Sequence, residues 1–100
     1  MKFAAKVHKS YRIVVAICDA ELLGKKFEEG NRQLDARENF FKDEEMDELS
    51  LIKLMQSQVR EDATFNIIGP NSIDLALKNN IISKECIGSV QNVPFALKLL

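Results

Sequence analysis

The sequence contains few of the residues on which metal centres depend. Its 100 residues include a single histidine, His8, and two cysteines, Cys18 and Cys86, which do not form a CxxC motif. A tetrahedral zinc site takes four ligands of the Cys or His type, so these three residues do not supply one. We therefore expect no metal and no cofactor. Because a cytosolic chain keeps its thiols reduced, we interpret both cysteines as small, buried apolar residues.

Long apolar runs are also absent. The longest covers residues 13–18, whereas a helix that crosses a membrane needs about 20 residues. Lysines interrupt the first nine residues, which therefore lack the apolar segment of a signal peptide. Four glycines and two prolines leave no room for a long linker. These absences predict a cytoplasmic protein that has no membrane partner and forms a single domain over residues 1–100.

Known catalytic motifs are missing as well. The sequence has no GxSxG, P-loop, GxGxxG or HExxH pattern. A histidine that acts as a general base needs a partner placed by the fold, and alternation along residues 3–8 puts His8 on the solvent side of a strand. We assign no catalytic residue and favour a non-catalytic protein over an enzyme.

What the sequence does contain is the composition of a globular protein of the α+β class. Apolar residues make up 46% and charged residues 29% of the chain. Alternating and β-branched segments predict strands over residues 3–7, 11–18, 31–37, 64–68 and 87–93. Apolar stripes at helical spacing predict two main helices, over residues 43–58 and 71–78. We expect a mixed sheet of about four to five strands with both helices packed on it.

Individual residues mark where some elements start and stop. Asp19 is expected to cap one helical turn at residues 20–23, and Gly24 is expected to close that turn in a left-handed conformation. Phe27 is the apolar anchor of the polar segment that follows. Acidic residues crowd positions 43–48, where the dipole of the predicted helix favours negative charge.

The second half of the sequence predicts a crossover followed by an apolar tail. The strand at 64–68, the next helix and the strand at 87–93 are expected to place the two strands parallel. Pro94 ends the last strand. The tail from Phe95 to Leu100 suits a contact with another protein or with a second copy of this chain.

The charges are separated along the chain. Residues 1–26 carry six basic and two acidic side chains, a net charge of +4, whereas residues 27–63 carry a net charge of −6. Such a separation orients a charged partner. Our leading hypothesis is a binding module that contacts RNA or a ribonucleoprotein through its basic first hairpin. The side chains assigned to this contact are Lys2, Lys6, Lys9, Arg12, Lys25 and Lys26.

Two other sites are candidates for small ligands. A strand that ends in glycine before a helix leaves free N–H groups, which attract phosphate or carboxylate. The residues of this anion- or nucleotide-binding loop are Asn66, Gly69, Asn71 and Ser72. The second candidate is the Cys18–Asp19 pair, where a thiol at the start of a helical turn suits a reactive centre.

Several residues resemble the motifs of a small archaeal family known as domain of unknown function number 424. The stretch CDAELLGKKFEEG at residues 18–30 is similar to that family's CDxELLGKxFxEG, and residues 66–69 and 87–94 resemble its second half. The resemblance implies a complete, cytosolic archaeal domain, and by association a link to translation or RNA metabolism. Phe95 stands where the family pattern GGVPHA has a histidine. The residues that carry the motif are Cys18, Asp19, Leu23, Gly24, Phe27, Gly30 and Pro94.

Overall fold

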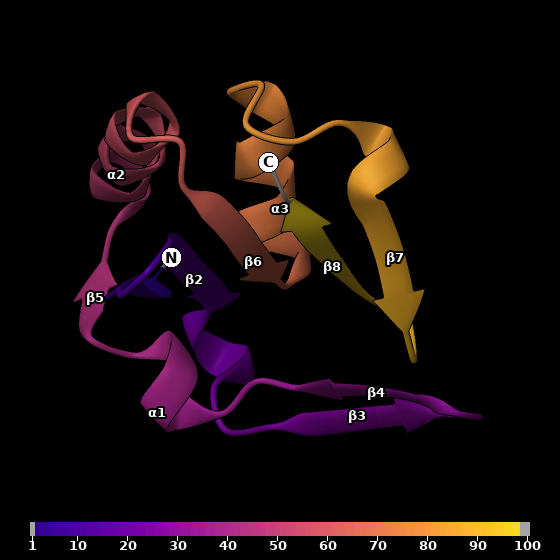
Figure 1. Ribbon diagram of the computed structural model, residues 1–100. Helices are drawn as coiled ribbons and strands as arrows, with labels where there is room; N and C mark the ends of the chain where they lie inside the picture. Colours follow the sequence, from indigo (N-terminus) through magenta and orange to yellow (C-terminus); the bar gives the residue numbers. More distant parts are fainter. Residues whose placement is uncertain (1, 99–100) are drawn as a thin grey trace.

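The main sheet of the protein has six strands (Figure 1). The computed structural model describes residues 2–98. The strands lie in the order β5-β1-β2-β6-β8-β7, and all neighbours are antiparallel except β2 and β6, which run parallel. Their bounds are β1 (Phe3–Lys9), β2 (Ile13–Asp19), β5 (Glu44–Met46), β6 (Thr64–Ile68), β7 (Ile87–Val90) and β8 (Val93–Lys98).

Two helices cover one face of this sheet, and a smaller hairpin covers the other (Figure 1). The helix face carries α2 (Glu48–Arg60) and α3 (Pro70–Lys78). The hairpin face carries α1 (Glu38–Phe41) and the two-stranded sheet of β3 (Lys26–Glu29) and β4 (Arg32–Asp35). Short 3₁₀ turns occupy Ala20–Leu22 and Lys84–Cys86. The α+β class and the packing of both main helices on a mixed sheet are confirmed, with six strands in place of four to five.

Each face of the sheet has its own apolar core. Because side chains alternate along a strand, β2 contributes Val15 and Ile17 to the helix-face core and Ala16 and Cys18 to the hairpin-face core. All four side chains are fully buried, which confirms the prediction of a central strand covered on both sides. The partners of β2 on the helix face include Leu51 and Met55 of α2 and Ile73, Leu75 and Ala76 of α3.

The first half of β1 and the predicted start of the long helix differ from expectation. Ala4 is buried, so the predicted solvent face of β1 is wrong there, because the hairpin face carries a layer of its own. The acidic segment at residues 44–46 is not helical but forms the edge strand β5, which pairs with Phe3–Ala5. The helix begins after Asp47, whose side chain accepts a hydrogen bond from Ser50 N at 2.9 Å. Pairing with β1 thus overrides the local helical preference.

The apolar tail is a central strand of the sheet. Gln91 and Asn92 have positive φ angles of 50° and 64° and form a tight turn that separates β7 from β8. Strand β8 then inserts between β6 and β7. The predicted parallel direction of β6 and β7 is correct, but the two strands are not neighbours. Pro94 does not end the strand, since its carbonyl accepts a hydrogen bond from Gly69 N at 2.9 Å.

The β3–β4 hairpin packs on the edge strand β7 and on its neighbour β8. Leu34 is buried as the sequence predicts, whereas the strand β3 has no counterpart among the predicted strands. The Arg32 guanidinium lies 5.8 Å from the centre of the Phe95 ring. A Cβ atom at Gly88 would lie 2.9 Å from Phe95 Cζ, so the absence of a side chain at Gly88 makes room for that ring. Phe95 therefore has a packing role at the position where a histidine is expected.

Candidate functional site

Asp19 lies at the carboxyl end of β2, beside the start of α3. Strand β6 runs parallel to β2 and leads into α3 through Gly69, so the two carboxyl ends lie side by side. Gly69 has φ +118°, a conformation that L side chains rarely adopt, and it also lacks the Cβ atom that would collide with Asp19. The backbone at Gly69 thereby lets the Asp19 carboxylate reach the first turn of α3.

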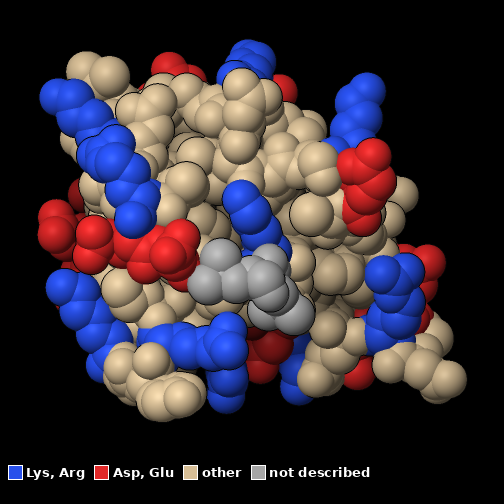
Figure 2. Space-filling model, turned by 45° about the horizontal axis from the view of Figure 1, so that its top comes forward, with Lys and Arg blue, Asp and Glu red and all other residues tan. Residues whose placement is uncertain are grey.

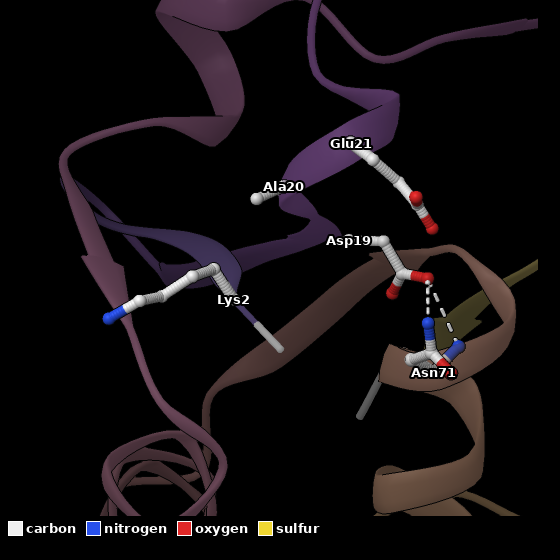
Figure 3. A pocket seen from close by; sticks show the side chains of 5 residues that line it. All are labelled: Lys2, Asp19, Ala20, Glu21 and Asn71. Atoms are coloured by element: carbon white, nitrogen blue, oxygen red, sulfur yellow. Dashed lines mark hydrogen bonds between the residues drawn. The ribbon is translucent and has the colours of Figure 1, made fainter.

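The Asp19 carboxylate accepts four hydrogen bonds from two residues of that turn. Figure 3 shows the two that come from Asn71. Asn71 donates its backbone N–H and its side-chain Nδ2–H to Oδ2, both at 3.1 Å. Ser72 donates its backbone N–H at 2.8 Å and its hydroxyl at 2.6 Å to Oδ1. Only 2% of Asp19 is exposed. We call Asp19, Gly69, Asn71 and Ser72 the Asp19 junction.

The Asp19 junction changes the interpretation of two predictions. Asp19 makes no side-chain cap to the turn that follows it, so its predicted local capping role is wrong. It caps α3 instead, from across the sheet. Of the predicted anion-binding loop, the N–H groups of Asn71 and Ser72 bind this internal carboxylate. Asn66 does not join them, because it lies in the middle of β6, paired with Ala16 and Leu97.

A surface pocket of about 420 Å³ lies beside the Asp19 junction. The residues that line it are Lys2, Asp19, Ala20, Glu21 and Asn71. Figure 3 shows the Lys2 amine directed away from Asp19 and Asn71. The Asp19 oxygens already accept bonds from α3, and the exposed residues of the lining are Lys2 and Glu21. Among residues 2–98, no group of three His, Cys, Asp or Glu side chains is placed to hold a metal ion.

Cys18 is buried behind Asp19. Its side chain is fully inaccessible, and its Sγ–H donates to the Asp19 carbonyl oxygen at 3.2 Å. Burial, and secondarily the nearby Asp19 carboxylate, raise the pKa of the thiol from 9.0 to about 12. The interpretation of Cys18 as a buried apolar residue agrees with this placement. Cys86 is only partly buried, so the same interpretation does not hold for it.

The two thiols are therefore expected to differ in reactivity. At pH 8 the native protein should react rapidly with one equivalent of an aromatic disulfide reagent, at Cys86, and the unfolded protein with two. Because folding raises the pKa of Cys18, this thiol favours the folded state below about pH 9, and that contribution is lost as pH rises toward 12. The Cys86→Ser variant should be unreactive when native. Rapid reaction of that variant would contradict the burial of Cys18.

The side chains of His8 and Lys6 both form hydrogen bonds with the backbone of α1. Nε2 of His8 donates to the Phe40 carbonyl oxygen at 2.8 Å, and the two rings stack with centroids 4.4 Å apart. Lys6 Nζ donates to the Asn39 carbonyl oxygen at 2.8 Å. The predicted solvent position of His8 is wrong because α1 covers this part of β1. His8 holds α1 against the sheet.

The other predicted basic residues lie apart from one another. Lys2 precedes β1 and Lys9 ends it, about 23 Å away at the usual rise per strand residue. Lys25 and Lys26 lie on the hairpin face, at the start of β3. Figure 2 shows basic and acidic side chains interspersed over the visible face rather than gathered in one patch of a single sign. The six basic residues therefore do not form one continuous surface.

The turn between β1 and β2 combines two cations with an aromatic ring. Lys9 and Arg12 are exposed there, and Tyr11 between them has 97% of its surface exposed. The predicted strand at 11–18 includes Tyr11, but β2 starts at Ile13. We call residues 9–12 the basic turn. The polar neighbours of Tyr11 are the sequence signal that separates it from the apolar run that follows.

The predicted contact tail is largely used within the fold. Ala96 is buried and Phe95 packs against the hairpin-face core. Leu97 has 53% of its surface exposed. Residues 99–100 lie outside the described residues. None of the helices within residues 2–98 is both long and apolar enough to span a membrane.

Comparison with known proteins establishes the family. Residues 8–99 match the family described as protein of unknown function (DUF424). The chain belongs to this family. A similar fold occurs in the crystal structure of an uncharacterized conserved protein from Methanopyrus kandleri, with a TM-score of 0.85 and 21% sequence identity, over 97% of this chain and 90% of that one. No curated protein matches the sequence.

The residues that carry the DUF424 motif have structural roles in this chain. Cys18 and Asp19 belong to the end of β2, and the Pro94 carbonyl binds Gly69 N opposite them. Leu23 and Phe27 pack on the hairpin-face core. Two glycines of the motif have positive φ angles, +84° at Gly24 and +61° at Gly30. The left-handed conformation of Gly24 is the one that the sequence predicts. The motif thus supplies the carboxylate of the Asp19 junction, the segment that leads into the β3–β4 hairpin and the turn of that hairpin.

Proposed function

We propose that this DUF424 protein is a non-catalytic module that binds RNA, alone or within a ribonucleoprotein such as the translation machinery, through its basic turn. The observation that carries the proposal is the fully exposed ring of Tyr11 between Lys9 and Arg12. Aromatic rings offer bases a stacking surface, and neighbouring cations neutralise phosphates.

The surroundings of the basic turn support this assignment. The ion pairs within residues 2–98 join Arg37 to Asp35 and Lys78 to Asp74, so Lys9 and Arg12 form none there. A large ring in water has no packing role in the fold, whereas Phe41 and Phe65 are buried. Lys2, Lys25 and Lys26 lie too far from the turn to share its contacts, and they supply at most separate phosphate contacts.

The alternatives have weaker geometric support. Cys18 is inaccessible, and the Asp19 oxygens are fully engaged by α3. For a protein partner at the tail, the exposed apolar contact within residues 95–98 is Leu97, because Phe95 and Ala96 pack inside the fold. Neither site presents a chemically free group as the basic turn does.

The proposal is tested by fluorescence polarisation with labelled oligouridine over a range of salt concentrations. We expect affinity to fall steeply with salt, because cations are released when lysine and arginine neutralise phosphates. The double variant Lys9→Ala/Arg12→Ala should bind more weakly and have a log–log salt slope shallower by about 1.4, at about 0.7 per single-strand phosphate contact. Tyr11→Ala should weaken binding about tenfold through lost stacking.

The matched control removes two exposed lysines elsewhere. Lys53→Ala/Lys84→Ala changes the net charge by the same amount as Lys9→Ala/Arg12→Ala, yet it should leave the affinity and the salt slope nearly unchanged. If both double variants lose the same amount of RNA affinity, net charge alone explains the loss. That result would contradict a binding site at the basic turn. No binding by the wild-type protein at about 50 mM salt would exclude the RNA proposal altogether.

A further inference from the structure

Among residues 2–98, a corner of the hairpin face of the main sheet lies between α1 and the β3–β4 hairpin and is covered by neither. Its residues are Val14 of β2, Asn66 of β6 and Leu97 of β8, which we call the open corner. Strand register makes Asn66 the direct neighbour of Leu97, and Val14 lies one residue from Ile13 at the start of β2. Val14 and Leu97 belong to neither apolar core, and Leu97 is 53% exposed.

The layer on the hairpin face ends on both sides of the open corner. On one side, α1 lies over β1, where it accepts hydrogen bonds from Lys6 and His8. On the other side, the β3–β4 hairpin lies over Phe95. Strand β2 begins immediately after the basic turn. Val14 therefore connects Tyr11 and Arg12 directly to this uncovered part of the sheet.

The chemistry of the open corner is that of a surface for bases. The Asn66 side chain is partly exposed, and its amide carries two N–H donors and an acceptor oxygen. Leu97 and Val14 beside it provide apolar contact. An amide can pair with the edge of an unstacked base. In an RNA duplex, side chains cannot read the major groove, and the shallow minor groove is recognised mostly through its shape, its 2′-hydroxyls and its phosphates.

We propose that the RNA bound by this protein is single-stranded and that its bases pass from Tyr11 across the open corner. The inference rests on the proposed function and adds the class of RNA and its path. The cations of the basic turn hold the phosphates at one end, and no lysine or arginine belongs to the open corner itself. The corner therefore contributes affinity that does not depend on salt.

The test compares an oligouridine of about 12 nucleotides with a blunt duplex of equal length as competitors for the labelled single strand. We expect the duplex to compete at least tenfold more weakly. The Asn66→Ala/Leu97→Ala variant should lose about tenfold in single-strand affinity with an unchanged salt slope, in contrast to the Lys9→Ala/Arg12→Ala variant. Leu49→Ala, which truncates an exposed leucine of α2, is the matched control and should bind like wild type.

The outcomes separate this inference from the proposed function. If the duplex competes as well as the single strand, or the Asn66→Ala/Leu97→Ala variant binds like wild type, the path across the open corner is wrong while binding at the basic turn stands. If that variant binds weakly but has also lost its native thermal transition, Asn66→Asp replaces it: its charge should repel RNA without removing apolar packing, and unchanged binding would overturn the inference. If wild-type protein binds no RNA, both proposals fail.

Discussion

Replacing Asp19 with alanine is expected to lower the free energy of unfolding by about 3–5 kcal/mol, because it leaves buried hydrogen-bond donors without an acceptor and each unsatisfied group costs about 1–3 kcal/mol. The carboxylate accepts four hydrogen bonds from Asn71 and Ser72 and is 2% exposed. Alanine leaves the two N–H groups at the start of α3 without their acceptor. Ser72 is itself fully buried, so water does not readily replace the carboxylate.

The measurement is urea unfolding followed by circular dichroism. The midpoint should shift to lower urea while the slope of free energy against urea stays constant, because the surface exposed on unfolding does not change. Asp74→Ala is the control: this carboxylate belongs to the same helix but is exposed and paired with Lys78, so the change should stay within about 0.5 kcal/mol. A loss below about 1 kcal/mol for Asp19→Ala would contradict the role of the junction, since even an ordinary helix cap is worth about that much.

The expected role of Asp19 illustrates what local sequence rules can and cannot predict. A carboxylate before a short turn fits the preferences for a cap, and the residue type is indeed one that caps a helix. Its actual partners, however, are 52 and 53 positions away along the chain. Strand β6 brings them to Asp19 by pairing with β2, and no pattern around residue 19 encodes that pairing. The chemistry was therefore predictable, whereas the partner was not.

The elements with strong internal patterning are predicted well. Strand β6 has the predicted bounds, and the buried run of β2 lies at the centre of the sheet. Most residues of both strands are β-branched or aromatic, so burial and local preference agree. Helix α3 is likewise close to expectation, except that it begins at Pro70 with Gly69 as its cap position.

The elements that differ from prediction depend on a distant partner. Residues 44–46 are acidic and suit the first turn of a helix, but they extend β1 at the sheet edge. Residues 95–98 resemble a free apolar tail, yet they fill the gap between β6 and β7 after a turn at Gln91 and Asn92. In each case the pairing of strands decides the structure, and its sequence signal is spread over two segments far apart.

In the candidate RNA site, too, some features follow from the local sequence and others depend on distant segments of the chain. The charge count over residues 1–26 directs attention to the first hairpin, where Lys9 and Arg12 are exposed. It does not distinguish these from Lys6, which donates to α1 at 2.8 Å. Nor does it place Asn66 on the opposite side of the sheet from α3, because that requires the register of β6 with its neighbours. Composition therefore identifies the region, and only the fold selects the residues.

Gly69→Ala is expected to destabilise the protein by about 3 kcal/mol or more, through two causes at one position. The first is backbone strain: φ +118° with ψ 147° is a region that glycine alone occupies readily, and strain of this kind costs about 1–3 kcal/mol. The second is collision. A Cβ atom would lie 2.6 and 2.8 Å from the two carboxylate oxygens of Asp19, and would overlap its Cγ, so the carboxylate has to leave its place on α3.

A double-mutant cycle in urea separates these two causes. Once Asp19 is alanine, a methyl group at Gly69 meets no carboxylate and displaces no hydrogen bond, so only the backbone strain remains. Gly69→Ala should therefore cost about 1–3 kcal/mol in the Asp19→Ala background, clearly less than in the wild-type protein. The matched control is Gly30→Ala, which has a positive φ of 61° but no atom near its Cβ position, and which should cost the same in both backgrounds. If the losses of unfolding free energy for Gly69→Ala and Asp19→Ala are additive, Gly69 is needed only for its backbone conformation. The Asp19 carboxylate would then reach α3 even with a Cβ atom at position 69.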